Sequence, residues 1–399
     1  MIVIRNKADI TIEYQVEKIA NKDKVIFFDI ETTGFSRKYC NVYLIGCMYY
    51  AGDELMYTQW LAENFNDEAN VLMAFHKFIK DFDTIIHFNG NSFDIPFVKE
   101  RGEKYMLEFN FENYKHIDIY KSVSSINHLL KMENQKQKSF EKLLGIHRTD
   151  PFSGGDLIEV FKHYVESKDE KLLLPLLLHN KEDVFNMGHL LSLLSFNDLF
   201  NHKYNVLNYR FNEYKNSLND TEKELTIAFS LENKIPVKIS YNIPGISLIM
   251  KEDKGQLTVN IVYGTFKYFF ENYKDYYYLT TEDVAIHKSI GQYVDNKYRK
   301  PATASTCYEK YTGDFLPIKK STNFKFSFKL EYKDKDQFIK SDSVNDENIK
   351  TYLDCIIDFI KEKPKRVCEI KSVNRHSMIS DGAVSSWNEL AALVYITSI

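Results

Sequence analysis

The pattern of apolar and polar residues over the first 200 positions switches between strand-like and helix-like segments. Continuous apolar runs are typical of strands buried on both faces, and alternation of apolar with polar residues is also typical of strands. These two patterns predict strands at 24–30, 42–50, 54–60, 84–88 and 116–119. Apolar residues recur at helical spacing at 66–80, 92–101, 139–145, 154–165 and 169–194. Pro175 predicts a bend between two helices in the last of these segments. Residues 1–23 could form a short strand or a helix.

Three strands followed by strand–helix alternation predict an α/β fold, in which helices cover both faces of a mixed sheet. The character of the chain changes after about residue 199, and residues 225–330 are rich in Tyr, Phe, Thr, Val and Ile with frequent turn residues, which predicts strands. The high charge of residues 333–346 predicts a linker or loop. The spacing of apolar residues predicts an amphipathic helix at 348–361, and a further helix could form at 387–399. We therefore expect an α/β domain at 1–199, a β-rich accessory domain at 200–340 and a helical C-terminal segment at 341–399.

Composition narrows the class of protein. A length of 399 residues suggests roughly two to three domains, and a net charge of −4 argues against a globally basic, polyanion-binding surface. Acidic residues outnumber basic ones up to residue 201 and are outnumbered beyond it, which would suit an acidic metal site beside a mildly basic region. The five cysteines show no C-x-x-C spacing, and we see neither a signal peptide nor a membrane-spanning run. We expect a cytoplasmic protein with no disulfides, no structural zinc and no membrane partner.

Two carboxylates follow the most apolar strand. Asp29 and Glu31 stand two residues apart after the run Val25–Phe28, so an extended chain would turn both to the same side. Two buried like charges repel each other and are costly to desolvate, unless a cation lies between them. Oxygen ligands of this kind favour Mg²⁺ or Mn²⁺. The alternative is that the pair is simply the polar end of a strand.

Further acidic residues stand at comparable places. Asp94 falls in the first turn of a predicted helix after the strand at 84–88, where a carboxylate could also merely cap the helix. His179 and Asp183 are four residues apart on a helix, so they lie on one face that borders the core. An unpartnered Asp on that side would be costly, although an ordinary His–Asp helix pair would also explain the spacing.

Three motifs together resemble a known family. DIETTGF carries Asp29 and Glu31, HFNGNSFDIP carries Asn89, Phe93 and Asp94, and HNKEDV carries Asp183. Their order and spacing over residues 20–195 are similar to those of the DEDD exonucleases, and most similar to the YprB-type ribonuclease H-like domain. In that branch a Tyr usually stands four residues before the last Asp, whereas His179 occupies this position here and Leu178 the position of the His in the other branch.

The resemblance implies a metal-dependent 3′–5′ exonuclease with a ribonuclease H-like fold and a link to DNA repair. On this hypothesis the four acids hold two Mg²⁺ or Mn²⁺ ions roughly 4 Å apart, and His179 acts as a general base near neutral pH. The substrate would be a single-stranded 3′ end, DNA in preference to RNA, with a helicase as a candidate partner. The residues expected to seat the last nucleotide are Thr32, Thr33, Gly34, Phe35, Asn89 and Phe93. Asp118 is expected to have a supporting role.

Other functions use the same residues. A structure-specific endonuclease or an RNA-trimming exonuclease would need the same acids, and a catalytically degenerate subunit would bind nucleic acid without cutting it. In the β-rich region, residues 273–278 and 297–300 mix aromatic and basic side chains, which could form a strand-binding groove. Such a mixture is more often an ordinary sheet surface covered by lysine stems, and we favour that interpretation.

Overall fold

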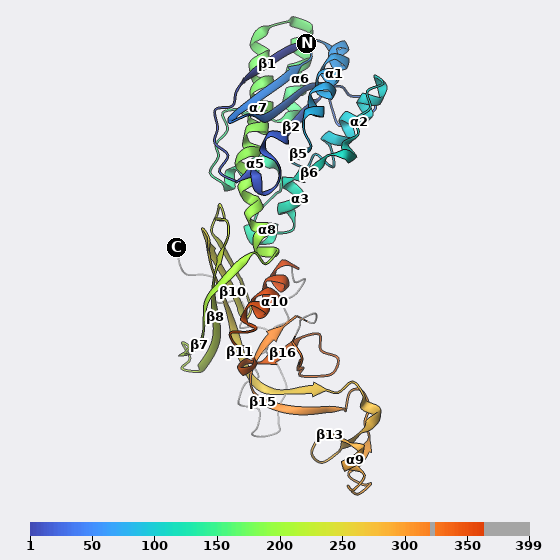
Figure 1. Ribbon diagram of the computed structural model, residues 1–399, viewed down its shortest axis with the longest axis vertical. Coiled ribbons are helices and arrows are strands. Elements are labelled where there is room, and N and C mark those ends of the chain that lie inside the picture. The colour runs from blue at the N-terminus through green and yellow to red at the C-terminus, as the bar shows by residue number, and fades with distance from the viewer. Residues whose placement is uncertain (320–323, 363–399) are drawn as a thin grey trace, which may run out of the picture. The chain divides into compact units, whose positions relative to one another are not determined.

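The computed structural model describes residues 1–319 and 324–362, which fall into two compact units (Figure 1). The first unit contains residues 1–260 and 344–362, and the second contains 261–319 and 324–343. The expected domain boundaries at residues 199 and 340 stay predictions. We describe each unit by itself.

The first unit contains a six-stranded mixed sheet. The strands lie side by side in the order β1 (Ile2–Lys7), β4 (Glu54–Leu61), β3 (Val42–Ala51), β2 (Val25–Thr32), β5 (Thr84–His87) and β6 (Lys115–Asp118). From β1 to β2 neighbouring strands are antiparallel, whereas β2, β5 and β6 are parallel. The three parallel strands therefore end at the same edge of the sheet, where sites gather in α/β folds. The predicted mixed α/β sheet is confirmed, and residues 1–23 contribute a strand to it.

Helices cover both faces of this sheet. Their bounds are α1 (Glu68–Phe78), α2 (Asp94–Lys104), α3 (Ile119–Ser124), α4 (Asn127–Leu130), α5 (Gln137–Leu143), α6 (Gly154–Ser167), α7 (Leu173–Leu190) and α8 (Ser195–Phe200). On one side of β2, Phe28 stacks on Phe75 of α1, with ring centroids 5.3 Å apart. The side chains of Asp29 and Glu31 instead face α7, the long green helix in Figure 1. The strand alternation thus delivers an apolar stripe to α1 and two acids to α7.

The expected bend at Pro175 is wrong. Helix α7 is a single helix of 18 residues, and a 3₁₀ turn at Glu170–Leu172 precedes it. Pro175 therefore lies in the first turn of α7. Amides in the first turn of a helix have no intrahelical acceptor, so a proline there loses no hydrogen bond.

The rest of the first unit is strand-rich and ends in a helix. Its elements are β7 (Tyr204–Lys215), β8 (Thr221–Leu231), β9 (Ile239–Ile243), β10 (Ile246–Lys251), the start of β11 (Lys254–Phe269) and α10 (Ile349–Lys361). Consecutive strands pair antiparallel, β7 with β8 and β10 with both β9 and β11. The predicted helix at 348–361 is confirmed, while the candidate helix at 387–399 lies outside the described residues.

The second unit is built from the remainder of β11 and further strands. These are β12 (Tyr276–Leu279), β13 (Val284–His287), β14 (Arg299–Pro301), β15 (Tyr308–Ile318) and β16 (Gln337–Lys340), with the short helix α9 (Lys288–Gly291). β16 contradicts the expected linker at 333–346, because Phe338 is buried against Phe266 and Phe315 and its strand pairs with β15. Charged neighbours hide these few apolar residues from an average over the segment. No helix among the described residues is both long and apolar enough to span a bilayer.

Candidate active site

The acidic residues singled out from the sequence meet in one cavity of about 560 Å³. It is lined by Asp29 and Glu31 from β2, Asp94 from the start of α2, and His179 and Asp183 from consecutive turns of α7, together with Asn89 and Phe93. Three segments far apart in the sequence therefore bring four carboxyl groups and one imidazole to the edge where the parallel strands end.

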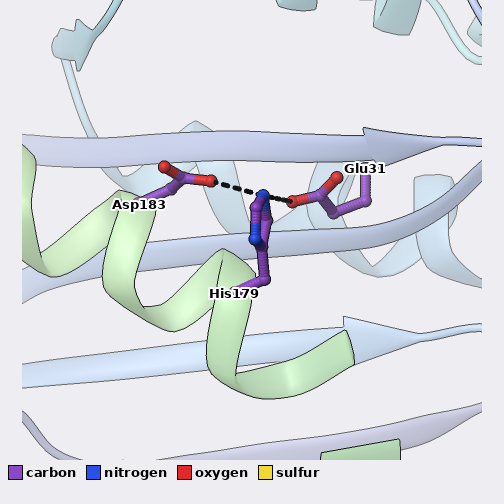
Figure 2. Close-up of side chains that lie close together, drawn as sticks. All are labelled: Glu31, His179 and Asp183. Carbon is purple, nitrogen blue, oxygen red and sulfur yellow. Dashed lines mark ion pairs between the residues drawn. The ribbon is translucent and has the colours of Figure 1, made fainter. Parts of the chain in front are cut away.

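The tightest group in the cavity consists of Glu31, His179 and Asp183. The Nε2 atom of His179 lies 3.3 Å from Oδ2 of Asp183 and 3.8 Å from Oε1 of Glu31 (Figure 2). One potential ligand atom from each of the three residues lies within 4.8 Å of the others, a separation that a single metal ion can bridge. Both acids converge on the same ring nitrogen, so the imidazole edge faces the acidic cluster.

The other two acids are held by fixed donors. Asn180 of α7 donates through Nδ2 to Oδ2 of Asp29 at 2.9 Å, and the backbone N–H of Ile30 donates to Oδ1 of Asp94 at 3.2 Å. Asn180 approaches closely because Gly46, the residue paired with Asp29 on β3, has no side chain. A Cβ atom on Gly46 would lie only 2.0 Å from Oδ1 of Asn180. The small residue in β3 therefore makes room for the amide that orients Asp29.

A nearby positive charge would stabilise the ionised form of the carboxyl groups in this cluster. Burial raises the pKa of Asp94 to about 7, and burial followed by repulsion from Asp183 and Asp94 raises the pKa values of Asp29 and Glu31 well above their ordinary range. A cation bound among them would remove this penalty. Because carboxylate oxygens dominate the donor set, the residues fit Mg²⁺ or Mn²⁺ rather than a thiolate-preferring metal.

Asp183 already has a cationic neighbour that the sequence did not reveal. Nη2 of Arg148 lies 2.5 Å from Oδ1 of Asp183, and the same guanidinium makes two hydrogen bonds of 2.5 Å with Glu141 of α5. Glu141 is buried, and the side chain of Arg148 is only 7% exposed. Gln137 donates to the backbone oxygen of Asp183 at 2.8 Å, so α5 and the loop after it fix this part of α7.

The ring of His179 is held on its other side by Asp150. Nδ1 of His179 lies 2.5 Å from Oδ2 of Asp150, whose carboxyl group is fully buried. Burial alone would raise the pKa of Asp150, but the N–H of Phe152, the imidazole and Lys138 together lower it. An ionised Asp150 keeps the proton on Nδ1, because Nδ1–H then donates to it. The lone pair of Nε2 is thereby directed into the acidic cavity.

Sequence reasoning missed several residues around the cavity. Asp150 and Arg148 belong to an irregular loop between α5 and α6, where no periodicity predicts which side chains turn inward. Tyr120 and Lys136 line the cavity as well, and Lys136 is exposed. The sole signal in the sequence was the location of Arg148 and Asp150 in a polar loop, and many polar loops carry such residues.

The predicted nucleotide-seating residues lie in two groups. Asn89 and Phe93 line the cavity, whereas Thr32, Thr33 and Gly34 do not. The hydroxyl of Thr32 donates to the backbone oxygen of Gly34 at 2.8 Å, and that of Thr33 accepts from the backbone N–H of residue 41 at 2.9 Å. These residues shape a turn, and their roles toward a substrate stay predictions.

Phe35 stands at the tip of that turn. Its side chain is 87% exposed, and its ring lies edge-on to Phe93 at 6.3 Å between centroids. Arg101 of α2 fixes the base of the loop, donating to the backbone oxygen of Lys38 at 3.2 Å and forming a buried ion pair with Glu68. An exposed ring on an anchored loop beside the cavity is accessible to a bound molecule.

Asp118 was the residue expected to have a supporting role. Asp118 is buried, accepts from the backbone N–H of Asn89 at 3.0 Å and caps α3, which gives it a supporting position.

In the second unit the aromatic and basic side chains contact one another: Arg299 lies 4.6 Å over the ring of Tyr277, and Tyr276 stacks on Phe270 at 4.7 Å. These contacts favour a role in stabilising that small sheet.

Comparison with known proteins agrees with this fold. A family model described as the RNase_H superfamily matches residues 26–195. These residues form an RNase H-like domain. All of the acids and the imidazole that line the cavity belong to the matched range. The YprB-type subdivision stays a prediction.

Two solved structures show the extent of the structural likeness. The family B DNA polymerase from the hyperthermophilic archaeon Pyrobaculum calidifontis is 20% identical, with a TM-score of 0.36, and the match covers 44% of this chain and 25% of the polymerase. E. coli exonuclease I in complex with a dT13 oligonucleotide is 10% identical, with a TM-score of 0.30, and the match covers 52% of this chain and 54% of the exonuclease. The likeness thus spans a quarter of one protein and about half of the other. None of the curated proteins matches this sequence.

Proposed function

We propose that this protein is a divalent-metal-dependent nuclease that removes nucleotides from the 3′ end of single-stranded nucleic acid, DNA in preference to RNA. One observation carries the proposal: four carboxyl groups and an imidazole from β2, α2 and α7 line a single cavity in an RNase H-like domain. The direction of degradation and the preference for DNA follow from the family resemblance of the three sequence motifs.

The metal-binding residues would be Asp29, Glu31, Asp94 and Asp183, holding two Mg²⁺ or Mn²⁺ ions. Burial and the raised pKa values of three of them support this assignment, since each carboxylate gains stability from a nearby cation. Such ions, when bound, stabilise the charge that develops on a phosphodiester and lower the pKa of a water molecule.

His179 is proposed as the general base. Its Nε2 faces the cavity, while Nδ1 donates to Asp150, so Nε2 is free to accept a proton from an attacking water molecule. Asp150 fixes the ring without touching the cavity, and we therefore regard it as a positioning residue. The phosphodiester breaks as the water oxygen attacks phosphorus, and the leaving 3′-oxygen takes a proton from solvent.

The substrate would be held by residues around the rim of the cavity. The exposed ring of Phe35 beside Phe93 offers a stacking surface for the last base, and stacking of this kind tolerates any sequence. Lys136 supplies a positive charge at the cavity for a phosphate, and Asn89 supplies an amide. Thr32, Thr33 and Gly34 form the turn that presents Phe35.

The decisive experiment is degradation of 5′-labelled single strands of matched DNA and RNA sequence, with Mn²⁺ and with chelator. A ladder that shortens from the 3′ end only when metal is present is the expected result. Asp29→Asn should lower the rate by roughly 10³-fold or more, because an amide cannot replace the charge of a metal-binding carboxylate. Asp53→Asn changes an exposed Asp in the turn between β3 and β4 and serves as the matched control.

The same gel separates the competing functions. Internal cuts would indicate an endonuclease, faster shortening of RNA would indicate an RNA-trimming enzyme, and binding without cutting would indicate a degenerate subunit. If Asp29→Asn degrades strands as fast as Asp53→Asn, the site assignment is wrong.

A further inference from the structure

A second, larger cleft of about 880 Å³ opens along the free edge of β6 in the first unit. β6 is the last strand of the six-stranded sheet, and residues of α3 and α8 line the cleft beside it. The cleft is completed by residues 14–19, by residues 232–233 after β8, and by the end of α10. Of its lining residues, Asn91 alone belongs to a motif that defines the candidate active site.

Exposed lysines dominate the charge of this cleft. Five of them line it: Lys18, Lys115, Lys121, Lys203 and Lys361. They come from four separate segments of the chain, since only Lys115 and Lys121 are neighbours in the sequence, so folding, and not a local run of basic sequence, collects them. Among these five lysines, only Lys203 has a carboxylate of a described residue within 4.0 Å of its ammonium group, that of Asp198 at 3.5 Å.

Among the described residues, the ammonium groups of the other four lysines have neutral hydrogen-bond partners or no hydrogen-bond partner. Lys115 and Lys18 donate to the backbone oxygen of Ile19 and to the side chain of Asn233. Lys361 reaches the backbone oxygen of residue 200 at 3.5 Å, and the ammonium group of Lys121 makes no hydrogen bond or ion pair with a described residue. Their charges are therefore not neutralised within the protein.

The carboxylates of the cleft do not offset these charges at its surface. Asp118 is buried and accepts hydrogen bonds from the backbone N–H groups of Asn89 and Lys121. Asp198 is buried too, and accepts from Asn233 besides its pair with Lys203. Glu232 is the one exposed acid among the lining residues. The open face of the cleft is thus positive, beside an active cavity that is strongly acidic.

The cleft and the acidic cavity adjoin each other. Asn89 and Tyr120 line the cavity, while Asn91, two residues further along the loop after β5, and Lys121, the next residue of α3, line the cleft. The hydrogen bond from Asn89 N–H to Asp118 ties the loop after β5 to the end of β6, where α3 begins. A chain that leaves the cavity across this boundary enters the lysine-lined cleft directly.

We propose that this cleft binds the phosphates of the single strand on the 5′ side of the nucleotide in the active cavity, an inference that rests on the proposed function. Lysine is a flexible point charge, so a row of lysines neutralises successive phosphates without reading bases. The ligand chemistry is that of a single-stranded polynucleotide backbone, and the cleft would make affinity grow with strand length.

The test compares two triple variants of the full chain. The cleft variant is Lys115→Gln, Lys121→Gln and Lys361→Gln; the control is Lys77→Gln, Lys162→Gln and Lys171→Gln, three exposed lysines elsewhere in the first unit. Each triple is combined with Asp29→Asn and assayed in chelator, so that binding is measured without hydrolysis. Fluorescence anisotropy then gives affinities for labelled dT3 and dT15 over a series of salt concentrations, and circular dichroism confirms that both variants are folded.

The cleft variant should lose most of the preference for dT15 over dT3, while the control retains it. For single strands, the slope of log affinity against log salt falls by about 0.7 for each phosphate that the protein no longer neutralises, so the slope for dT15 should fall by about 2 in the cleft variant alone. Equal length preference and equal slopes in the two triples would overturn the inference. A loss of affinity for inorganic polyphosphate that leaves dT15 binding unchanged would assign the cleft to another polyanion and would also overturn it.

The two proposals fail in different ways. If the wild-type chain shortens 3′ ends but the two triples bind dT15 alike, the nuclease assignment stands and the cleft inference falls. If the wild-type chain with Mn²⁺ leaves every strand intact, the proposed function falls, and the inference built on it falls with it.

Discussion

Nδ1 of His179 lies 2.5 Å from Oδ2 of Asp150, on the side of the ring that faces away from the acidic cavity. The opposite nitrogen, Nε2, lies 3.3 Å from Oδ2 of Asp183. The imidazole therefore bridges a buried carboxylate of the α5–α6 loop and the proposed metal-binding cluster. Its orientation depends on a residue that is 29 positions away in the sequence.

Asp150→Asn should reduce turnover while leaving substrate binding intact. An amide presents either a donor or a weaker acceptor to Nδ1, so the ring loses the partner that fixes its tautomer; losses of roughly 10- to 100-fold are typical when such a partner is removed. We expect the fall in kcat with KM changed little, and a change in the ¹⁵N shifts of His179 that reports the tautomer.

The matched control for this variant is Asp169→Asn. Asp169 is an exposed residue that caps the 3₁₀ turn before α7, and Asn caps such a turn equally well. If Asp150→Asn retains wild-type kcat, or if the ¹⁵N shifts do not change, Asp150 has no positioning role.

The acids of the site could be predicted from the sequence because each lies in a periodic element. Strand alternation places Asp29 and Glu31 on one face, and helical spacing places His179 and Asp183 on one face. These are short-range rules, and they hold whatever the rest of the fold does. Asp94 was predictable because it begins the helix that follows the strand β5 in the chain.

Other features depend on long-range packing and could not be predicted. Arg148 and Asp150 turn inward from an irregular loop because α7 supplies their partners, which no local pattern shows. The five lysines of the β6 cleft come from four separate segments that meet only after folding. The wrong bend at Pro175 arose because the boundary between the 3₁₀ turn and α7 could not be read from the sequence.

Arg148→Met should destabilise the fold and impair the site. The side chain of Arg148 is almost entirely covered and pairs with both Glu141 and Asp183, so its loss leaves a fully buried Glu141 without its cation. Removing one partner of a buried ion pair costs about 3–5 kcal/mol of unfolding free energy. Chemical denaturation followed by circular dichroism measures this loss.

A second substitution provides the check on that explanation. Adding Glu141→Leu removes the orphaned charge, so the double variant should regain a large part of the lost stability. The opposite outcome is that Glu141→Leu lowers the unfolding free energy further, by as much as a core substitution costs. The destabilisation by Arg148→Met would then come from poorer packing and not from an unpaired charge.

Gly46→Ala tests the close approach of Asn180 to β3. Because the new Cβ would lie 2.0 Å from Oδ1 of Asn180, the amide must move and release Asp29. Overpacking of this kind costs typically about 1–3 kcal/mol, and we expect a loss of nuclease activity beyond any loss of folded protein. Gly154→Ala is the control, since nothing lies within 4 Å of a Cβ at that helix start.

The coupling can be measured directly. If Asn180 is the group displaced, Gly46→Ala should add little damage to a chain that already carries Asn180→Ala. Full additivity of the two effects on the unfolding free energy and on activity would show that the alanine acts on something other than this amide.

Metal removal and pH should act on stability through the same carboxyl groups. Burial raises the pKa of Asp94 to about 7, whereas an unfolded Asp has a pKa of about 3.9. Between these values the folded state binds more protons than the unfolded state, so stability of the metal-free protein falls as pH rises through about 4 to 7. Asp29 and Glu31 are shifted in the same direction.

A second buried group acts with the opposite sign and has to be separated. Burial lowers the pKa of His87 to about 4, so the unfolded state binds more protons between about pH 4 and 6.5, and this group contributes stability that is lost as pH falls. The difference between wild type and Asp94→Asn isolates the carboxyl contribution, because His87 is present in both.

Thermal unfolding from pH 5 to 8 in chelator is the measurement. Asp94→Asn should gain stability relative to wild type as pH rises, because the wild-type chain alone must bury an additional charge. Mn²⁺ should stabilise the wild-type chain more at pH 8 than at pH 5, since binding requires ionised carboxylates, and should stabilise Asp94→Asn less. A wild-type midpoint that Mn²⁺ does not raise at pH 8, or a difference between the two chains that stays constant with pH, would contradict a metal-binding role for this buried cluster.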